Sequence, residues 1–287
     1  MKNLIQKAFL VLMLLFLNET ITAQNISGKA YYESKTTIDT DFGGRQMSEQ
    51  RRAQIKERMK SAFEKTYVLS FNKSQSLYKE EVALDPNTGA GGRGRFRIIF
   101  GGAGGGTQYK DIVKAQLIEE RELFGKQFLI KDSLPVLKWK LEKENKQIGQ
   151  YICFKATAIK RVEITNTFRF GRRNNTENNP SEKSSGQEET SKEIIVTAWY
   201  TPQIPLAHGP GEYGGLSGLI LELNADRTTI LCSKIIINTK ETKPIKELTK
   251  GKIVSRKAFN KIVNQKTKEM QEQFQRRRGR GDGAFRH

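Results

Sequence analysis

Histidine and cysteine are scarce in this sequence of 287 residues, which contains two of each. No pair among His208, His287, Cys153 and Cys232 has the short spacing of zinc or haem ligands, so the sequence predicts no metal site and no cofactor. Long apolar runs are lacking too. The run Ala8–Leu17 covers ten residues, whereas a membrane-spanning helix needs about 20.

The start of the chain, residues 1–23, has the three-part layout of a secretory signal peptide. Lys2 and Lys7 are followed by an apolar run, and Ala23 offers a small residue at the cleavage point. No cysteine follows the run, so we expect no lipid-anchored N-terminus. We therefore expect an exported protein that does not span the membrane after cleavage. The periplasm is the first destination to consider, with the outer-membrane surface or the medium as alternatives.

Acidic residues are few, with 31 against 50 lysines and arginines and a net charge of +19. Loss of Lys2, Lys7 and Glu19 with the signal peptide changes this net charge to +18. Such a charge would suit nucleic acid, but export removes that partner, so we predict no nucleic-acid binding. An anionic envelope surface, an acidic polymer or an acidic protein fits better. The charge could equally serve solubility alone.

The mature chain reads as short strands, rich in aromatic and β-branched residues and separated by turns. The expected strands are residues 26–38, 67–71, 76–82, 108–112, 115–123, 126–130, 139–141, 147–148, 150–165, 194–200, 219–224 and 228–238. Within 150–165, one parity carries apolar residues and should be the buried face: Ile152, Phe154, Ala156, Ala158, Val162 and Ile164. The other parity carries Cys153, Lys155, Thr157, Arg161 and Glu163.

Two helices complete the prediction. Apolar residues of helical spacing indicate one over 47–63, and Ser255 can cap a second that ends near Arg276. The fold class is therefore mainly β with a minor α+β character: a curved antiparallel sheet or open half-barrel, with one helix in the N-terminal half and one at the C-terminus. The expected domain organisation is a signal peptide (1–23), one β-rich domain (24–254) with flexible insertions at 85–106 and 171–192, a helix (255–276) and a disordered basic tail (277–287).

No catalytic constellation is recognisable. The glycines at 101–106 lack the Gly-Lys-Ser/Thr ending of a phosphate-binding loop, so a flexible linker is predicted. His208 has no identifiable nucleophile or orienting acid and is interpreted as a structural loop residue. Cys153 and Cys232 could form a disulfide in an oxidising compartment, or be two separate buried residues. We therefore predict no enzyme and name no catalytic residue.

The run AWYTPQIPLAHGPGEYGGLSGLILEL, residues 198–223, resembles the GLPGLI family of exported Gram-negative bacterial proteins. The residues that carry the resemblance, which also form a hypothetical binding rim, are Trp199, Tyr200, Thr201, Pro205, Gly209, Pro210, Tyr213, Gly215, Leu216, Gly218, Leu219 and Ile220. Trp139 and the segment 148–156 are similar to the family's upstream pattern. Ser217 stands where the family has proline, so we expect a less rigid turn. The resemblance implies export and a fold but brings no activity, catalytic residue or cofactor.

The leading hypothesis is an exported envelope protein, non-enzymatic, that binds an unknown envelope protein or an apolar ligand through a concave sheet or the rim at 199–220. One alternative is an enzyme or enzyme accessory acting on an envelope polymer or peptide. Another is a structural component of an outer-membrane assembly. A deep apolar cavity would favour the first, a cleft joining His208 to a carboxylate or a cysteine the second, and an exposed apolar patch without a cavity the third.

Overall fold

The computed structural model describes residues 26–37, 48–51, 54, 63–81, 106–163, 191–238 and 244–281. The predicted signal peptide, most of the predicted helix at 47–63, and residues 85–105, 171–190 and 282–287 lie outside the described residues. Within the predicted first helix, positions 49–51 are helical.

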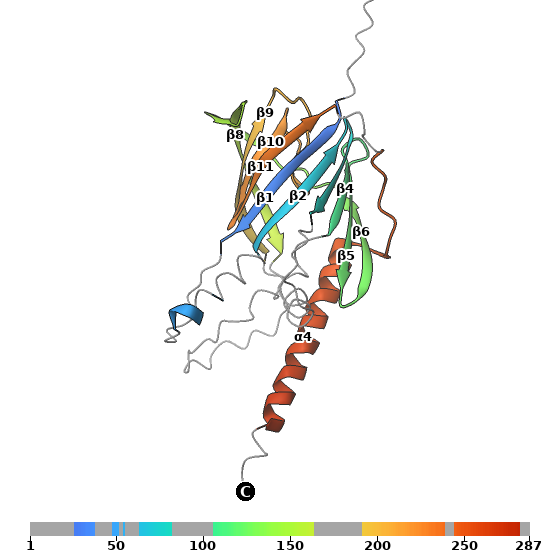
Figure 1. Ribbon diagram of the computed structural model, residues 1–287. Helices are drawn as coiled ribbons and strands as arrows, with labels where there is room; N and C mark the ends of the chain where they lie inside the picture. Colours follow the sequence, from blue (N-terminus) through green and yellow to red (C-terminus); the bar gives the residue numbers. More distant parts are fainter. Residues whose placement is uncertain are drawn as a thin grey trace, which may run out of the picture.

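The described strands form one open, curved sheet of twelve strands (Figure 1). In chain order they are β1 (Gly28–Thr36), β2 (Glu64–Phe71), β3 (Gln75–Glu80), β4 (Thr107–Asp111), β5 (Gln116–Leu123), β6 (Lys126–Ser133), β7 (Lys140–Ile148), β8 (Tyr151–Glu163), β9 (Ser191–Thr201), β10 (Leu219–Ala225), β11 (Thr228–Ile237) and β12 (Lys252–Val254). Their spatial order is β12-β6-β5-β4-β3-β2-β1-β11-β10-β9-β8-β7. Neighbours pair antiparallel except β12, which is parallel to β6. The mainly β, curved antiparallel architecture is confirmed.

Short turns with local hydrogen bonding explain why successive strands pair. Between β2 and β3, the Asn72 Oδ1 accepts hydrogen bonds from the backbone N–H groups of Ser74 and Gln75, at 2.9 and 2.7 Å. This Asx turn, together with the backbone hydrogen bond from the Asn72 N–H to the Gln75 carbonyl at 2.9 Å, reverses the chain. Between β10 and β11, Asp226 adopts a φ of 53°, a conformation that Asp tolerates better than most residues.

The sequence-based prediction differs most from the structure at β7, β9 and β12. β7 is one continuous strand rather than two pieces, and its pairing with β8 is irregular between Leu141 and Asn145. β9 begins at Ser191, so residues 191–192 belong to the sheet and not to the predicted insertion. β12 was not predicted, because three residues carry too little pattern to identify a strand.

Two apolar clusters fill the centre of the sheet. One joins β1, β2, β3, β8, β10 and β11: Ala30, Tyr32, Leu69, Phe71, Tyr78, Cys153, Ile204, Leu206, Leu219, Leu221 and Cys232. The other joins β8, β9 and β10: Ala156, Val196, Ala198, Tyr200, Leu216, Ile220 and Leu223. Both clusters include side chains from the segment between β9 and β10, which is therefore part of the core.

The predicted buried face of β8 is only partly correct. Ala156 and Ala158 are buried, but Ile152 and Phe154 are exposed, and Cys153 from the opposite face is fully buried. Alternation identified the two faces correctly, but burial depends on what packs over each one. Ala156 shares a cluster with Leu216 of the segment after β9, whereas Cys153 meets the cluster of β1, β2 and β10.

The distal part of the β8–β9 hairpin extends beyond its neighbours. β8 pairs with β9 as far as Glu163 and Ser191. On the other sides, β7 reaches only Thr157 of β8, and β10 reaches only Val196 of β9. The last residues of the hairpin therefore pair only with each other, and form a two-stranded arm.

Helix α4 (Arg256–Gly281) follows β12 and lies against β5 and β6 at its start (Figure 1). Ser255 caps it, since the Ser255 Oγ accepts from the Ala258 N–H at 3.2 Å. Its Phe259 and Val263 side chains are buried in a cluster completed by Leu123, Phe128 and Ile130. The helix continues to residue 281, so 277–281 are helical rather than part of the predicted disordered tail. Among the described residues, no helix is long and apolar enough to cross a membrane.

Candidate functional site

The residues of the hypothetical binding rim lie mostly inside the protein. The segment 202–218, here called the signature loop, connects β9 to β10. Of the rim residues, Tyr200, Thr201, Gly209, Pro210, Leu216, Gly218, Leu219 and Ile220 are buried, Trp199 and Tyr213 are half-buried, and Pro205 and Gly215 are exposed. Most residues of this sequence pattern therefore pack the loop against the sheet and do not form an exposed rim.

Two glycines of the loop are required by its geometry. A Cβ at Gly218 would lie 2.2 Å from the carbonyl oxygen of Thr201, which is far too close for any other residue. Gly215 has a φ of +84°, a left-handed conformation that favours glycine. Of the glycines that resemble the family signature, Gly218 thus allows the loop backbone to approach that of Thr201, and Gly215 allows the chain to turn. Ser217, between them, is exposed.

The inner side of the signature loop is held by a buried lysine from β4. Lys110 is 1% exposed. Its Nζ donates hydrogen bonds to three backbone carbonyl oxygens of the loop, those of Gly209, Gly211 and Tyr213, at 3.3, 3.2 and 2.5 Å. Three acceptors match the three donors of an ammonium group. Lys110 therefore joins β4 to a loop about a hundred positions later in the chain.

Burial lowers the pKa of Lys110 to about 7, and the nearby Glu212 carboxylate only partly opposes this change. Such a lysine could act as a nucleophile if it were accessible. Here the amine is enclosed by the carbonyls that it donates to. Its geometry suits a structural tether rather than a reacting group.

His208 occupies a similarly enclosed position. Its Nε2 lies 2.9 Å from the Asn72 carbonyl oxygen, in the β2–β3 turn. Because a carbonyl only accepts, Nε2 carries the proton, and the buried Nδ1 has no hydrogen-bond partner within the described structure. Burial, and then the positive charge of Lys110, lower the pKa of His208 to about 3. His208 therefore stays neutral and fully buried, with the Lys110 amine close enough for its charge to act on the imidazole.

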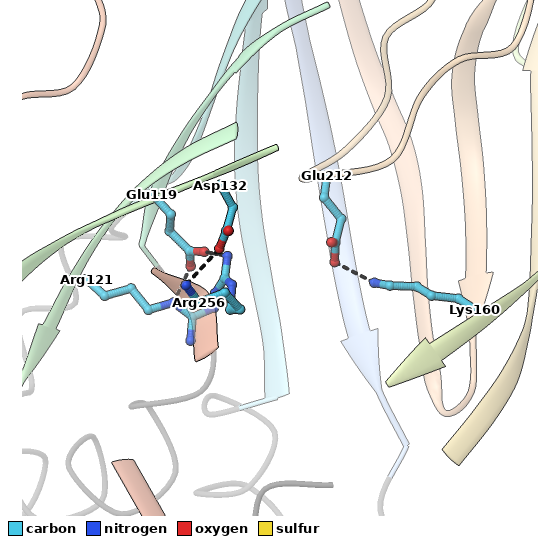
Figure 2. Close-up of polar contacts among 6 residues, drawn as sticks. All are labelled: Glu119, Arg121, Asp132, Lys160, Glu212 and Arg256. Carbon is cyan, nitrogen blue, oxygen red and sulfur yellow. Dashed lines mark hydrogen bonds and ion pairs between the residues drawn. The ribbon is translucent and has the colours of Figure 1, made fainter. Parts of the chain in front are cut away.

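The outer side of the loop is held by Trp139 and Lys160. The Trp139 Nε1 donates to the Gly214 carbonyl at 2.9 Å. The Lys160 Nζ, from β8, donates to Glu212 Oε1 at 2.5 Å (Figure 2). The same Nζ lies 4.8 Å from the centroid of the Tyr213 ring. The loop is thus fixed from β4 on one side and from β8 on the other.

A second polar cluster fixes the start of α4 (Figure 2). Glu119 of β5 is 1% exposed, and both Arg121 and Arg256 donate to its carboxylate. Burial would raise the pKa of Glu119, but the two guanidinium groups outweigh it and hold this pKa below its usual value. Asp132 of β6 accepts from the Arg256 backbone N–H at 2.7 Å. The first turn of α4 has no acidic residue of its own, so β5 and β6 supply the negative charge that a helix N-terminus favours.

The two cysteines lie in the same apolar cluster and are free thiols in the structure. Burial raises the pKa of the Cys153 thiol to about 11 and that of Cys232 to about 12. Such thiols are poor nucleophiles at neutral pH. The hypothesis of a disulfide between them stays a prediction.

Exposed apolar side chains gather at the β7 edge of the sheet. Leu141, Ile152 and Phe154 are 63%, 54% and 38% exposed. Leu141 pairs with Ala156, and Ile152, Phe154 and Ala156 share one face of β8 by alternation. The Phe154 ring lies 6.4 Å from the Tyr200 ring, between centroids. We call these three residues the apolar edge surface.

The described side chains contain no group of three or more histidines, cysteines and carboxylates that could hold a metal ion. His208 and the two thiols are buried and separated in their contacts. What the arrangement provides is a loop held from both sides, an anchored helix and an apolar edge that no described element covers.

Sequence reasoning missed Lys110 and Glu119. A lysine or glutamate inside a short strand usually faces solvent. Arg121 lies two positions from Glu119, but Arg256 and the carbonyl partners of Lys110 lie roughly a hundred or more positions away. No local signal in the sequence could have identified these distant contacts. The signature loop, in contrast, was found from its glycines and aromatics.

The comparisons with known proteins support a family of unknown function over part of the chain. Residues 139–222 match a family described as "Protein of unknown function (Porph_ging)". This span contains Trp139, the tethered loop and β10 up to Glu222. No curated protein is similar enough to the sequence to count as a match.

Two solved structures are distantly similar to the chain. The structure described as PNGF-II in the C2 space group has 11% sequence identity and a TM-score of 0.43, covering 83% of this chain and 32% of that chain. The structure of LprF from Mycobacterium bovis has 7% identity and a TM-score of 0.25, covering 77% of this chain and 89% of that chain. The chain thus spans about a third of the PNGF-II chain. The central part of the chain, from Trp139 to Glu222, therefore carries the pattern of a family whose function is unknown.

Proposed function

We propose that this chain is an exported, non-enzymatic envelope protein of the GLPGLI type that binds a protein partner through its apolar edge surface. The single observation that carries the proposal is the exposure of Leu141, Ile152 and Phe154 on one face of the last two strands. Large apolar side chains that gather in this way are typical of interaction sites. Export to the periplasm is part of the proposal and rests on residues 1–23.

The binding of a protein is favoured over that of a small apolar ligand. A ligand would need space between the strands, and the signature loop places Ile204, Leu206 and Leu216 in the clusters at the centre of the sheet. An apolar surface that lies at the sheet edge instead is accessible to a macromolecule. The apolar side chains of a partner would extend the cluster around Tyr200 and Ala156.

The partner is expected to cover the face of β7 and β8 rather than to add a strand beside β7. Edge strands that are charged and irregular resist strand addition. β7 has the sequence KLEKENKQI, and its pairing with β8 is irregular between Leu141 and Asn145. Contact through side chains is therefore more favourable than backbone pairing.

A non-enzymatic role is supported by the burial of His208, Cys153 and Cys232. His208 has its pKa lowered to about 3, and the Cys153 thiol has its pKa raised to about 11. A general base or nucleophile for neutral pH should have a pKa near 7 and access to its substrate. Lys110 meets the first condition and not the second.

The test is site-specific photo-crosslinking in cells. A photoreactive amino acid at position 141 or 152 should give one adduct of discrete mass, because a partner covers these positions. Val113, which is 79% exposed in the turn after β4, is the matched control and should give none. The same adducts from all three positions, or none from 141 and 152, would overturn the proposal.

A second variant separates binding from folding. Ile152→Ser should abolish the adduct formed from position 141 while the thermal unfolding midpoint remains close to that of the wild type, since the Ile152 side chain is 54% exposed. If the adduct persists at full yield in this variant, the apolar side chains are not what the partner recognises.

A further inference from the structure

The two-stranded arm at the end of β8 and β9 exposes an apolar pair on one face. Ile159 and Ile195 stand directly opposite each other in the register, and they are 67% and 69% exposed. At the base of the arm the opposite face carries Ala158 and Val196, which are both buried. Alternation therefore leaves one face of the arm open to solvent, and we call it the arm face.

The arm needs support that the described strands do not give it. A ribbon of only two strands is marginally stable in water, and none of the described strands flanks this one beyond Thr157 and Val196. Large apolar side chains that stand together on a surface are typical of interaction sites. Both properties favour a partner that covers the arm face.

The charges of the arm face nearly balance. Next to the isoleucines, the Arg161 Nη2 donates to the Glu193 Oε1 at 3.1 Å, and these side chains are 71% and 59% exposed. Glu163 follows, opposite Ser191. One arginine and two glutamates give the arm face a net charge of −1, in a chain whose net charge is +19. Two copies of this basic protein can therefore meet at the arm face with little repulsion.

A second copy of the arm fits this pattern when a twofold axis runs parallel to the strands. Two sheets that pack face to face keep their strands within about 30° of each other, about 10 Å apart. Rotation about such an axis places β8 of one copy over β9 of the other at the same height. Each residue then faces the one that is opposite it in its own arm: Ile159 faces Ile195 of the second copy, Arg161 faces Glu193, and Glu163 faces Ser191. Like charges do not meet, and each contact occurs twice.

We propose that the arm face is a homodimerisation site, at which two copies of this chain pack their arms face to face around a twofold axis. Four isoleucines form its centre, and Arg161 and Glu193 of both copies form its charged part. The contact is small, so the dimer belongs to the weak, concentration-dependent class. Ile152 and Phe154 of the apolar edge surface lie on the opposite face of β8 by alternation, so this site does not depend on the proposed function.

The isoleucine pair also stabilises the arm itself, because β-branched residues opposite each other favour strand pairing. That role alone would predict a change in the stability of the arm and no dimer. The two explanations therefore differ in one measurable quantity, which is the mass of the protein in solution.

The first experiment is sedimentation velocity of the chain without residues 1–23. Between about 5 and 500 μM the wild type should change from monomer to dimer. Ile195→Ser should weaken dimerisation by about tenfold or more, because the contact loses half of its central apolar side chains. Ile253→Ser is the matched control, since Ile253 is 65% exposed on β12. It should leave dimerisation within about twofold of the wild type.

The second experiment exchanges the charges. A variant that combines Arg161→Glu with Glu193→Arg keeps the ion pair within each arm and the ion pairs between two identical copies, so it should dimerise about as well as the wild type. In a mixture with the wild type, arginine would face arginine and glutamate would face glutamate. Native mass spectrometry with isotope-labelled wild type should therefore find mixed dimers at least about tenfold rarer than random pairing gives.

Three results would refute the proposal. A wild type that stays monomeric over the whole concentration range would leave the arm face to an unlike protein. Equal dimerisation of the wild type and Ile195→Ser would place the contact on another surface. Free mixing of the charge-exchanged variant with the wild type would exclude the twofold arrangement along the strands.

Discussion

Replacing Lys110 with methionine is expected to lower the free energy of unfolding by about 2–5 kcal/mol. Methionine keeps much of the length of the lysine stem but has no donor. The carbonyl oxygens of Gly209, Gly211 and Tyr213, at 3.3, 3.2 and 2.5 Å from the Nζ, would lose this partner. Each unsatisfied buried carbonyl costs about 1–3 kcal/mol, and removing a buried charge offsets part of that sum.

Urea unfolding of the wild type and of Lys110→Met measures this difference. Hydrogen exchange adds a local readout, because the Gly215 and Ile220 amides donate to carbonyls within the loop and should exchange faster in the variant. Lys114→Met is the matched control. Lys114 is exposed in the turn after β4, so its loss should change stability by no more than about 0.5 kcal/mol.

The pH dependence of the same pair of proteins tests the electrostatic part of the reasoning. Burial lowers the pKa of Lys110 from 10.5 to about 7. Between these two values the unfolded chain binds more protons than the folded one, so the contribution of Lys110 to stability rises as the pH increases from 7 to 10.5. The stability difference between the wild type and Lys110→Met should therefore widen over this range.

Two results would refute the account of Lys110. Lys110→Met could unfold at the same urea concentration as the wild type, with unchanged exchange at Gly215 and Ile220. The lysine would then not stabilise the loop. A stability difference that stays constant from pH 7 to pH 10.5 would show that burial does not lower its pKa.

Four further predictions concern other parts of the fold. Because burial lowers the pKa of His208 from 6.5 to about 3, stability should fall as the pH drops from 6.5 to 3, and His208→Gln should flatten this dependence in urea titrations. Glu119→Gln should cost about 2–3 kcal/mol and increase hydrogen exchange in the first turns of α4, since two arginines lose their carboxylate. Gly218→Ala should cost about 3 kcal/mol or more in thermal or urea unfolding, because its Cβ would meet the carbonyl of the residue at 201. Cys153 and Cys232 should resist a maleimide in the folded protein and both react after unfolding, as measured by mass.

Each of these predictions has a control or a contrary outcome. Glu122→Gln changes an exposed residue of the same strand, and Ser217→Ala changes an exposed neighbour of Gly218; both should be nearly neutral. An unchanged acid sensitivity in His208→Gln would assign the pH dependence to other groups. A denatured protein with no reactive thiol would contain a disulfide, in contrast to the free thiols of the structure.

Local patterns in the sequence were sufficient to predict most of the sheet. β10 and β11 follow from the alternation around Leu219, Leu221 and Leu223 and from the turn at Asp226. The start of α4 follows from Ser255 and from apolar residues at helical spacing. These patterns involve residues that are close in the chain, so they can be recognised without knowledge of the tertiary structure.

The candidate site depended on contacts that no local pattern encodes. The loop was expected to form a rim, but Leu216 and Ile220 are buried, since the loop folds into the sheet instead of bordering it. On β8, Phe154 was expected to be buried and is exposed, because nothing in the described structure covers that end of the edge pair. For the loop and for β8 alike, the sequence indicated which residues share a face. Whether that face is buried depends on the element that packs against it, and the sequence did not indicate this.

The two-stranded arm at the end of β8 and β9 makes the fold tolerant of variation in length. Beyond Thr157 and Val196, none of the described strands flanks the arm. The described contact that joins the arm to α4 is the 2.6 Å hydrogen bond between Asn260 and Glu163. A chain inserted between Glu163 and Ser191 can therefore grow or shrink without disturbing the register of β7, β10 or β11. The same position is a natural choice for an epitope tag or a small reporter domain.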